Sequence, residues 1–128
     1  SFMVNIKKGF YGIQQSQEKK LIVYTTIIKW GLYYLSDYVG LFAIQTTSHL
    51  DWRAGLAILT MSSLSFAVPI QGAIGAYHIL VSSILMAYGI SQSNALLYAG
   101  VIHAMHMLTI LLCGGLSVLF MKLLTNKR

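Results

Sequence analysis

The chain has 128 residues, of which 56% are hydrophobic and only 9% are charged. An ordinary soluble domain carries about 25% charged residues, so the composition argues against a soluble fold and indicates one membrane domain. The formal net charge is +6, and most of the basic residues lie in the two ends: Lys7, Lys8, Lys19, Lys20, Lys122, Lys127 and Arg128. Basic flanks around apolar segments are typical of cytoplasmic ends, so we expect no nucleic-acid partner.

The first residues, SFMVNIKKGF, lack the layout of a signal peptide. We interpret the chain as the C-terminal piece of a longer polytopic protein. The lone Cys113 lies in an apolar run and is expected to pack as a small hydrophobic residue.

Residues 1–20 predict an interfacial amphipathic helix. Phe2, Ile6, Phe10 and Ile13 recur at helical spacing, whereas Lys7, Lys8, Gln14, Gln15 and Gln17 fall mostly elsewhere. A cytoplasmic loop is the alternative. Residues 21–45 are long enough to cross the membrane, although they carry Lys29 and Asp37.

A second full-length span is predicted over residues 94–122. The loop 46–53, TTSHLDWR, has no basic excess and is assigned to the outside, while the basic tail is assigned to the cytoplasm. The prediction is therefore a multi-pass membrane protein with both ends of this chain cytoplasmic.

Residues 54–90 must then leave and return on the outer side. They contain two apolar runs, 54–68 and 76–90, each of which would give about 22 Å of helix, less than a hydrocarbon core of about 30 Å. We favour a re-entrant helical hairpin that turns at PIQGAIG. Two short helices that each cross the whole membrane would also begin and end on the outer side, and they remain the alternative. The expected fold class is all-α, with two transmembrane helices flanking this hairpin.

The turn of the hairpin contains the helix-breaking residues of the chain. Pro69 lacks a backbone donor, and Gly72 and Gly75 permit positive φ. Non-helical backbone at membrane depth must be buried in protein or line a watery cavity, and the helix that follows presents free N–H groups that suit an anion. We therefore expect a site for an anion, such as a phosphate or carboxylate, formed by Pro69, Gln71, Gly72, Gly75, Tyr77 and His78. A plain extracellular turn is the alternative.

Asp37, His103 and His106 are further ionisable groups within the predicted spans, and we expect them to line a polar cavity. The two histidines share one helix face and with Asp37 or His78 could form a metal site or a proton relay. No HExxH or carboxylate-rich pattern supports a metal, so we predict neither metal nor cofactor. Asp37 is expected to pair with Lys29 or with a residue outside this chain. Gly100, Gly114, Gly115 and Ser117 indicate close helix packing.

Several segments, among them VPIQGAIGAYHILV, LMAYGI, IHAMHML and GGLSVLF, resemble the C-terminal part of the lysylphosphatidylglycerol synthase transmembrane-region family, which are flippase-like membrane proteins of bacteria and archaea. The family has a proline followed by Gly-Gly-Ile-Gly; here Ala73 replaces the second glycine, and His78 stands where many relatives have Glu. The resemblance implies a protein of the bacterial cytoplasmic (inner) membrane that binds and translocates anionic or aminoacylated phospholipid. It also implies that the site predicted between Pro69 and His78 is a head-group site.

The soluble aminoacyl-transfer domain of the best-known members of that family is absent from this sequence, so a non-enzymatic role is favoured. The expected partners are membrane phospholipid, the preceding helices of the longer protein and further copies of the chain in a homo-oligomer. The alternatives are a membrane-embedded lipid-modifying enzyme, with Asp37, His78, His103 or His106 as acid and base, and a non-catalytic transmembrane module of a lipid synthase.

Overall fold

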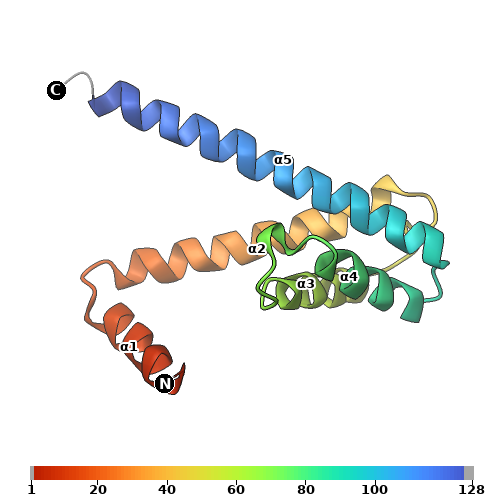
Figure 1. Ribbon diagram of the computed structural model, residues 1–128, viewed down its shortest axis with the longest axis horizontal. Coiled ribbons are helices and arrows are strands. Elements are labelled where there is room, and N and C mark those ends of the chain that lie inside the picture. The colour runs from red at the N-terminus through yellow and green to blue at the C-terminus, as the bar shows by residue number, and fades with distance from the viewer. Residues whose placement is uncertain (1, 126–128) are drawn as a thin grey trace. The chain divides into compact units, whose positions relative to one another are not determined.

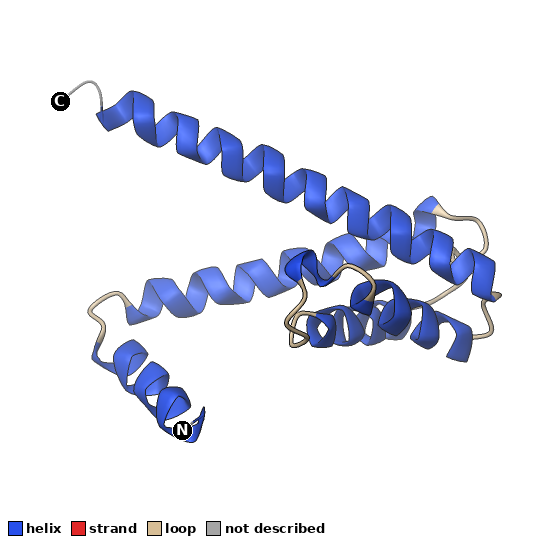
Figure 2. Cartoon of the chain, viewed as in Figure 1, coloured by secondary structure: helices blue, strands red, loops and turns tan. Residues whose placement is uncertain are grey.

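The computed structural model describes the backbone of residues 2–125 and the side chains of residues 4–5, 7–9, 11–12 and 16–125. Within residues 2–125 the chain consists of α-helices and one short 3-10 helix joined by turns, with no strand (Figures 1 and 2). The all-α prediction is therefore confirmed. The helices group into two compact units, Ser1–Leu35 and Ser36–Arg128.

The first unit holds helix α1, Phe2–Gln15, and the beginning of α2, Lys19–Ala43. The predicted single helix over 1–20 is corrected, because the chain turns at Ser16, whose hydroxyl accepts the Glu18 N–H at 3.1 Å. A serine in this position favours a new helix start. The Lys29 ammonium lies 5.5 Å from the centroid of the Trp30 ring, a cation–π contact.

The amphipathic face predicted for residues 1–20 depends on side chains that lie outside the described ones: Phe2, Ile6, Phe10, Ile13, Gln14 and Gln15. Of the polar residues assigned to the opposite face, Lys7, Lys8 and Gln17 are exposed. The interfacial position of α1 stays a prediction.

Side-chain caps set the turn between α2 and α3. The buried Thr47 hydroxyl donates to the Leu41 carbonyl at 2.7 Å and to the Ile44 carbonyl at 3.0 Å, which satisfies carbonyls that a helix end leaves without partners. Asp51 then caps α3, Trp52–Ser65, by accepting the N–H groups of Arg53 and Ala54. As a result α2 ends two residues before the predicted boundary at 45, and α3 begins two residues before the predicted boundary at 54.

Replacing the Asp51 cap should be measurable. We expect Asp51→Ala to lower the free energy of unfolding by about 1 kcal/mol, because two backbone N–H groups lose their acceptor. Asp51→Asn keeps a side-chain oxygen at the cap and should recover most of that loss. Equilibrium unfolding in mixed detergent micelles measures both variants. Equal losses for Ala and Asn would show that the charge of Asp51, and not its capping bond, stabilises α3.

Helix α3 packs against α4, Ala76–Ala87, and α4 packs against the start of α5, Gln92–Thr125 (Figure 1). Each helix buries one stripe at helical spacing. The buried stripes are Ala54, Ile58, Ser62 and Ser65 on α3, Tyr77, Val81 and Leu85 on α4, and Ala95, Ala99 and Ile102 on α5. Many of these residues are small, which allows helices to approach closely, as in membrane bundles.

The break between α3 and α4 covers residues 66–75 and includes the 3-10 helix η1, Gln71–Ala73. Gly72 and Gly75 have φ values of 65° and 88°, and Ala73 also has a positive φ of 53°. A Cβ added at Gly72 would lie 3.9 Å from the Met107 sulfur. The break therefore lies beside α5 at Met107, which follows the start of α5 by about 22 Å of helix.

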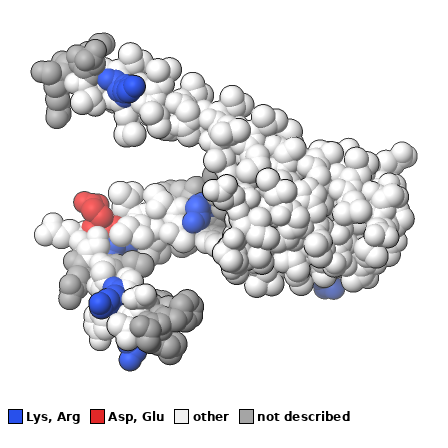
Figure 3. Space-filling view, viewed as in Figure 1, with Lys and Arg blue, Asp and Glu red and all other residues white. Residues whose placement is uncertain are grey.

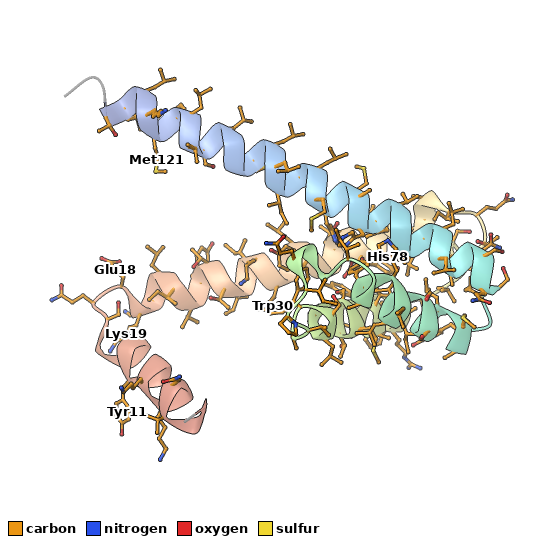
Figure 4. All side chains as sticks on the ribbon, in the orientation of Figure 1. Tyr11, Glu18, Lys19, Trp30, His78 and Met121 are labelled. Carbon is orange, nitrogen blue, oxygen red and sulfur yellow. The ribbon has the colours of Figure 1, made fainter. Side chains whose placement is uncertain are left out.

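Beyond that contact α5 continues as a single helix. Every residue from Leu108 to Thr125 is exposed, and the surface of this helix in Figure 3 is almost entirely uncharged up to the basic residue near its end, Lys122. The labelled Met121 in Figure 4 belongs to this segment. With 34 residues, α5 is about 51 Å long.

Among the described residues, α5 is the one helix both long and apolar enough to cross a membrane. Helix α2, with 25 residues, is long enough but insufficiently apolar, so the second span predicted over 21–45 stays a prediction. Within the described chain nothing packs against Gly100, Gly114 or Gly115, because a Cβ at each would meet nothing within 4 Å, so close helix packing at these glycines stays a prediction. Ser117 and Cys113 are also exposed.

Candidate functional site

A cluster of polar side chains lies in the second unit, where the end of α2 meets α3, α4 and α5. We call it the polar cluster, and its members are Ser36 and Asp37 of α2, Ser62 of α3, Tyr77 and His78 of α4, and Tyr98, His103 and His106 of α5. Figure 4 labels His78, at the start of α4. The cluster lies next to the break, since His106 immediately precedes Met107.

Asp37 is the buried carboxyl of the polar cluster, with 1% of its surface exposed. Its Oδ1 lies 3.8 Å from Nε2 of His106, and that nitrogen lies 3.0 Å from the Ser36 hydroxyl. The Ser62 side chain faces the carboxyl, and its own hydroxyl donates to the Leu59 carbonyl at 2.9 Å. Oδ1 has no hydrogen-bond partner. A buried carboxyl oxygen without a donor is energetically costly, so it points to a ligand, a proton or a nearby charge.

Three aromatic rings form the other half of the polar cluster. The His103 ring centroid lies 4.6 Å from that of Tyr77 and 5.2 Å from that of His78. The Tyr77 hydroxyl and Nε2 of His103 are both buried and have no hydrogen-bond partner. Native interiors leave few buried polar atoms without a partner, and here they lie in one cluster with Oδ1 of Asp37. The rings could therefore donate to or accept from a polar group placed among them.

Tyr98 holds the backbone of Asp37. Its hydroxyl, fully buried, donates to the Asp37 carbonyl at 2.6 Å. One turn along α2, Gly40 allows the helices to approach, because a Cβ there would lie 2.6 Å from Cδ1 of Ile102 and 3.3 Å from the Tyr98 hydroxyl. The bond and the close contact together hold Asp37 against α5.

The two buried tyrosines provide a matched test. We expect Tyr98→Phe to lower the free energy of unfolding by about 1 kcal/mol, since it removes a formed hydrogen bond. Tyr77→Phe removes a buried hydroxyl without a partner and should leave stability unchanged or raise it by about 1 kcal/mol. Equilibrium unfolding of both variants in the same micelles is the measurement. Equal losses would mean that the Tyr77 hydroxyl has a protein partner in solution.

The polar cluster brings together residues from the two groups of site residues predicted from the sequence. Asp37, His103 and His106, predicted as cavity lining, lie with Tyr77 and His78 from the predicted head-group site. The pairing of Asp37 with Lys29 is corrected, because the carboxyl of Asp37 lies beside His106 instead. Pro69, Gln71 and Gly72 are exposed on the break, and Gly75 is half-buried as the N-cap of α4, where no side chain caps the helix.

Sequence reasoning missed Ser36, Ser62, Tyr98 and Gly40. Tyr98 and Ser62 lie within apolar runs, each three or four residues from buried residues of its own helix. This helical spacing could have identified both as inward-facing. No local signal identified which residues they would contact. Among the residues whose side chains are described, no group of three or more His, Cys, Asp and Glu has an arrangement that could hold a metal ion.

Comparisons with protein-family models, with curated proteins and with solved structures find no match to this chain. The similarity to the lysylphosphatidylglycerol synthase transmembrane-region family therefore rests on the residues quoted above and stays a prediction. What the chain does must be argued from the polar cluster and from the helices that surround it.

Proposed function

We propose that this chain is a membrane-embedded module that binds the head group of an anionic or aminoacylated phospholipid in the polar cluster and helps to translocate it between leaflets. The observation that carries the proposal is the burial of three polar atoms without partners in one cluster: Asp37 Oδ1, the Tyr77 hydroxyl and His103 Nε2. These atoms lie beside a helix that is apolar and long enough to cross a membrane. A polar group from a lipid would satisfy them.

The length of the helices supports a re-entrant hairpin. Helices α3 and α4 have 14 and 12 residues, or about 21 and 18 Å, which is shorter than the hydrocarbon core. The break between them lies beside α5 at Met107, close to the middle of the 34-residue helix. In a bilayer crossed by α5, the hairpin would therefore turn at depth, with His103 and His106 at the same level.

The chemistry of the cluster fits a head group. The Tyr77 hydroxyl and the His103 ring can donate to phosphate oxygens, and the uncapped start of α4 at Gly75 adds free N–H groups and a positive dipole end. The Asp37 carboxylate can accept from a hydroxyl or from the ammonium group of an aminoacylated lipid. Pro69, Gln71 and Gly72 would form the mouth through which the head group enters.

The test is a leaflet assay with the chain reconstituted in liposomes that contain a fluorescent phosphatidylglycerol. A membrane-impermeant reductant quenches outer-leaflet lipid, and further quenching reports translocation. We expect the wild-type chain to accelerate translocation over protein-free liposomes, and Asp37→Asn to reduce the added rate at least about tenfold, the effect of losing one buried charged hydrogen bond.

Glu18→Gln is the matched control, because Glu18 is an exposed acid outside the polar cluster, and it should leave the rate unchanged. Equal rates with and without the protein would refute the proposal. Mass spectrometry of the same lipids separates translocation from lipid modification: a new product that disappears in Asp37→Asn would establish the enzyme instead.

The arrangement in the cytoplasmic membrane belongs to the same proposal and can be tested by labelling. The exposed Cys113 is first replaced by alanine, and single cysteines are placed at positions 71–75. An impermeant thiol reagent added from outside should label a control cysteine at exposed Thr46 and label positions 71–75 slowly. Labelling of positions 71–75 as fast as position 46 would show a plain extracellular turn.

A further inference from the structure

We propose that the polar cluster is a proton-binding site in which Asp37 and His106 share one exchangeable proton, and that His78 and His103 connect this pair to the surface on the α4 side. The inference goes beyond lipid binding and does not depend on it. It rests on the placement of titratable groups from separate helices around the buried Asp37 carboxyl.

The first step is the transfer between His106 and Asp37. Protonated His106 gives its Nε2 proton to Oδ1 of Asp37: the N–H bond breaks, an O–H bond forms, and a neutral imidazole and a neutral carboxylic acid remain. The two atoms lie 3.8 Å apart, so transfer needs an approach of about 1 Å or one bridging water. The Ser36 hydroxyl, 3.0 Å from the same nitrogen, can hold the ring as its charge changes.

The second step is access from outside the cluster. The His106 side chain is 23% exposed and His78 is half-buried, whereas Asp37, Tyr77 and His103 are buried. The polar cluster thus contains one partly exposed imidazole on α5 and one on α4, and the His78 ring lies 5.2 Å from that of buried His103. Histidine is suited to such relays because its charge changes near physiological pH.

The groups that face Asp37 come from all the packed helices. Helix α3 contributes Ser62, which does not titrate; α4 contributes Tyr77 and His78; α5 contributes Tyr98, His103 and His106. The Tyr98 hydroxyl already donates a hydrogen bond to the backbone carbonyl of Asp37. The imidazoles are thus the groups of the cluster whose ring nitrogens can both take up and release a proton beside the carboxyl.

Infrared difference spectroscopy of the chain in lipid nanodiscs tests the proposal, because the sequence has only three acidic side chains. On acidification we expect a carbonyl band of a protonated carboxyl that is lost in Asp37→Asn and retained in Glu18→Gln. In nitrogen NMR, the chemical shifts of the His106 ring nitrogens should change over the same pH range as the intensity of this band.

Replacing the partner tests whether the proton is shared. His106→Gln should move the midpoint of the Asp37 band by about one pH unit, the coupling expected of interacting sites. The matched control His49→Gln, on the exposed turn before α3, should leave the midpoint unchanged. Circular dichroism of His106→Gln and Asp37→Asn verifies that the helices are retained.

Two results would overturn the proposal: a carboxyl band that persists in Asp37→Asn, or a band whose midpoint is the same in His106→Gln and in the wild-type chain. Failure of lipid translocation with linked titration intact would refute the proposed function and leave the proton site standing. Translocation by a chain in which His106→Gln leaves the midpoint of the Asp37 band unchanged would refute the proton site and leave the proposed function standing.

Discussion

A lysine at position 74 is expected to destabilise the chain in a bilayer by about 2.5–3.5 kcal/mol, the insertion cost of a charged side chain near the centre of the membrane. Ile74 lies on the break, between Ala73 and Gly75, and its side chain is 66% exposed. It therefore points away from the protein. If the hairpin turns at depth, the lysine ammonium enters hydrocarbon; if the break is an extracellular turn, it enters water.

The measurement is equilibrium unfolding of the chain reconstituted in liposomes. Ile74→Ala separates the loss of the apolar side chain from the cost of the charge, and Thr46→Lys introduces the same charge on the exposed turn after α2. We expect Ile74→Lys to be less stable than Ile74→Ala by most of the stated amount, and Thr46→Lys to be nearly neutral. A small effect of Ile74→Lys would place the break in water and remove the support for a re-entrant hairpin.

The helices of the second unit follow closely from runs of apolar residues. The span predicted over 94–122 corresponds to α5, Gln92–Thr125, and the apolar run 76–90 corresponds to α4, which begins at Ala76. The errors at the end of α2 and at the start of α3 arise from single side chains. Asp51 starts α3 early and Thr47 ends α2 early, and apolar patterning carries no information about either cap.

The sequence identified most of the polar cluster only as ionisable side chains in apolar segments, and it did not show which of them contact one another. His106 and Ser36 are 70 residues apart in the chain, and Tyr98 and Asp37 are 61 residues apart. No local pattern fixes contacts of that separation. Sequence reasoning paired Asp37 with Lys29, which is near along the same helix, or with a residue outside this chain, whereas the group beside its carboxyl is His106 of α5. For the same reason it missed the close contact at Gly40.

Gly40 is where a side chain should do the most damage to packing. We expect Gly40→Leu to lower the free energy of unfolding by about 1–3 kcal/mol, the usual cost of overfilling a packed contact. Even the first carbon of the new side chain would lie 2.6 Å from Cδ1 of Ile102, so α2 and α5 must separate or Ile102 must move. The Tyr98 hydroxyl, 3.3 Å from the same Cβ, would then lose its bond to the Asp37 carbonyl.

Gly31→Leu is the matched control, because Gly31 is in the same helix and a Cβ there meets nothing within 4 Å. Leucine favours helix over glycine, so this control should be neutral or stabilising in unfolding experiments in mixed micelles. Combining Gly40→Leu with Ile102→Ala should recover part of the loss, since the second change removes the atoms that clash. Additive losses in the double variant would show that position 40 does not face Ile102.

The Gly40 variant also links packing to the polar cluster. If the approach of α2 to α5 holds Asp37 beside His106, then separating these helices should disturb the Asp37 carboxyl without changing any residue that titrates. Gly40→Leu should therefore alter the pH dependence of the protonated-carboxyl band, and Gly31→Leu should not. An unchanged band in Gly40→Leu would mean that Asp37 keeps its surroundings by contacts with α3 and α4 alone.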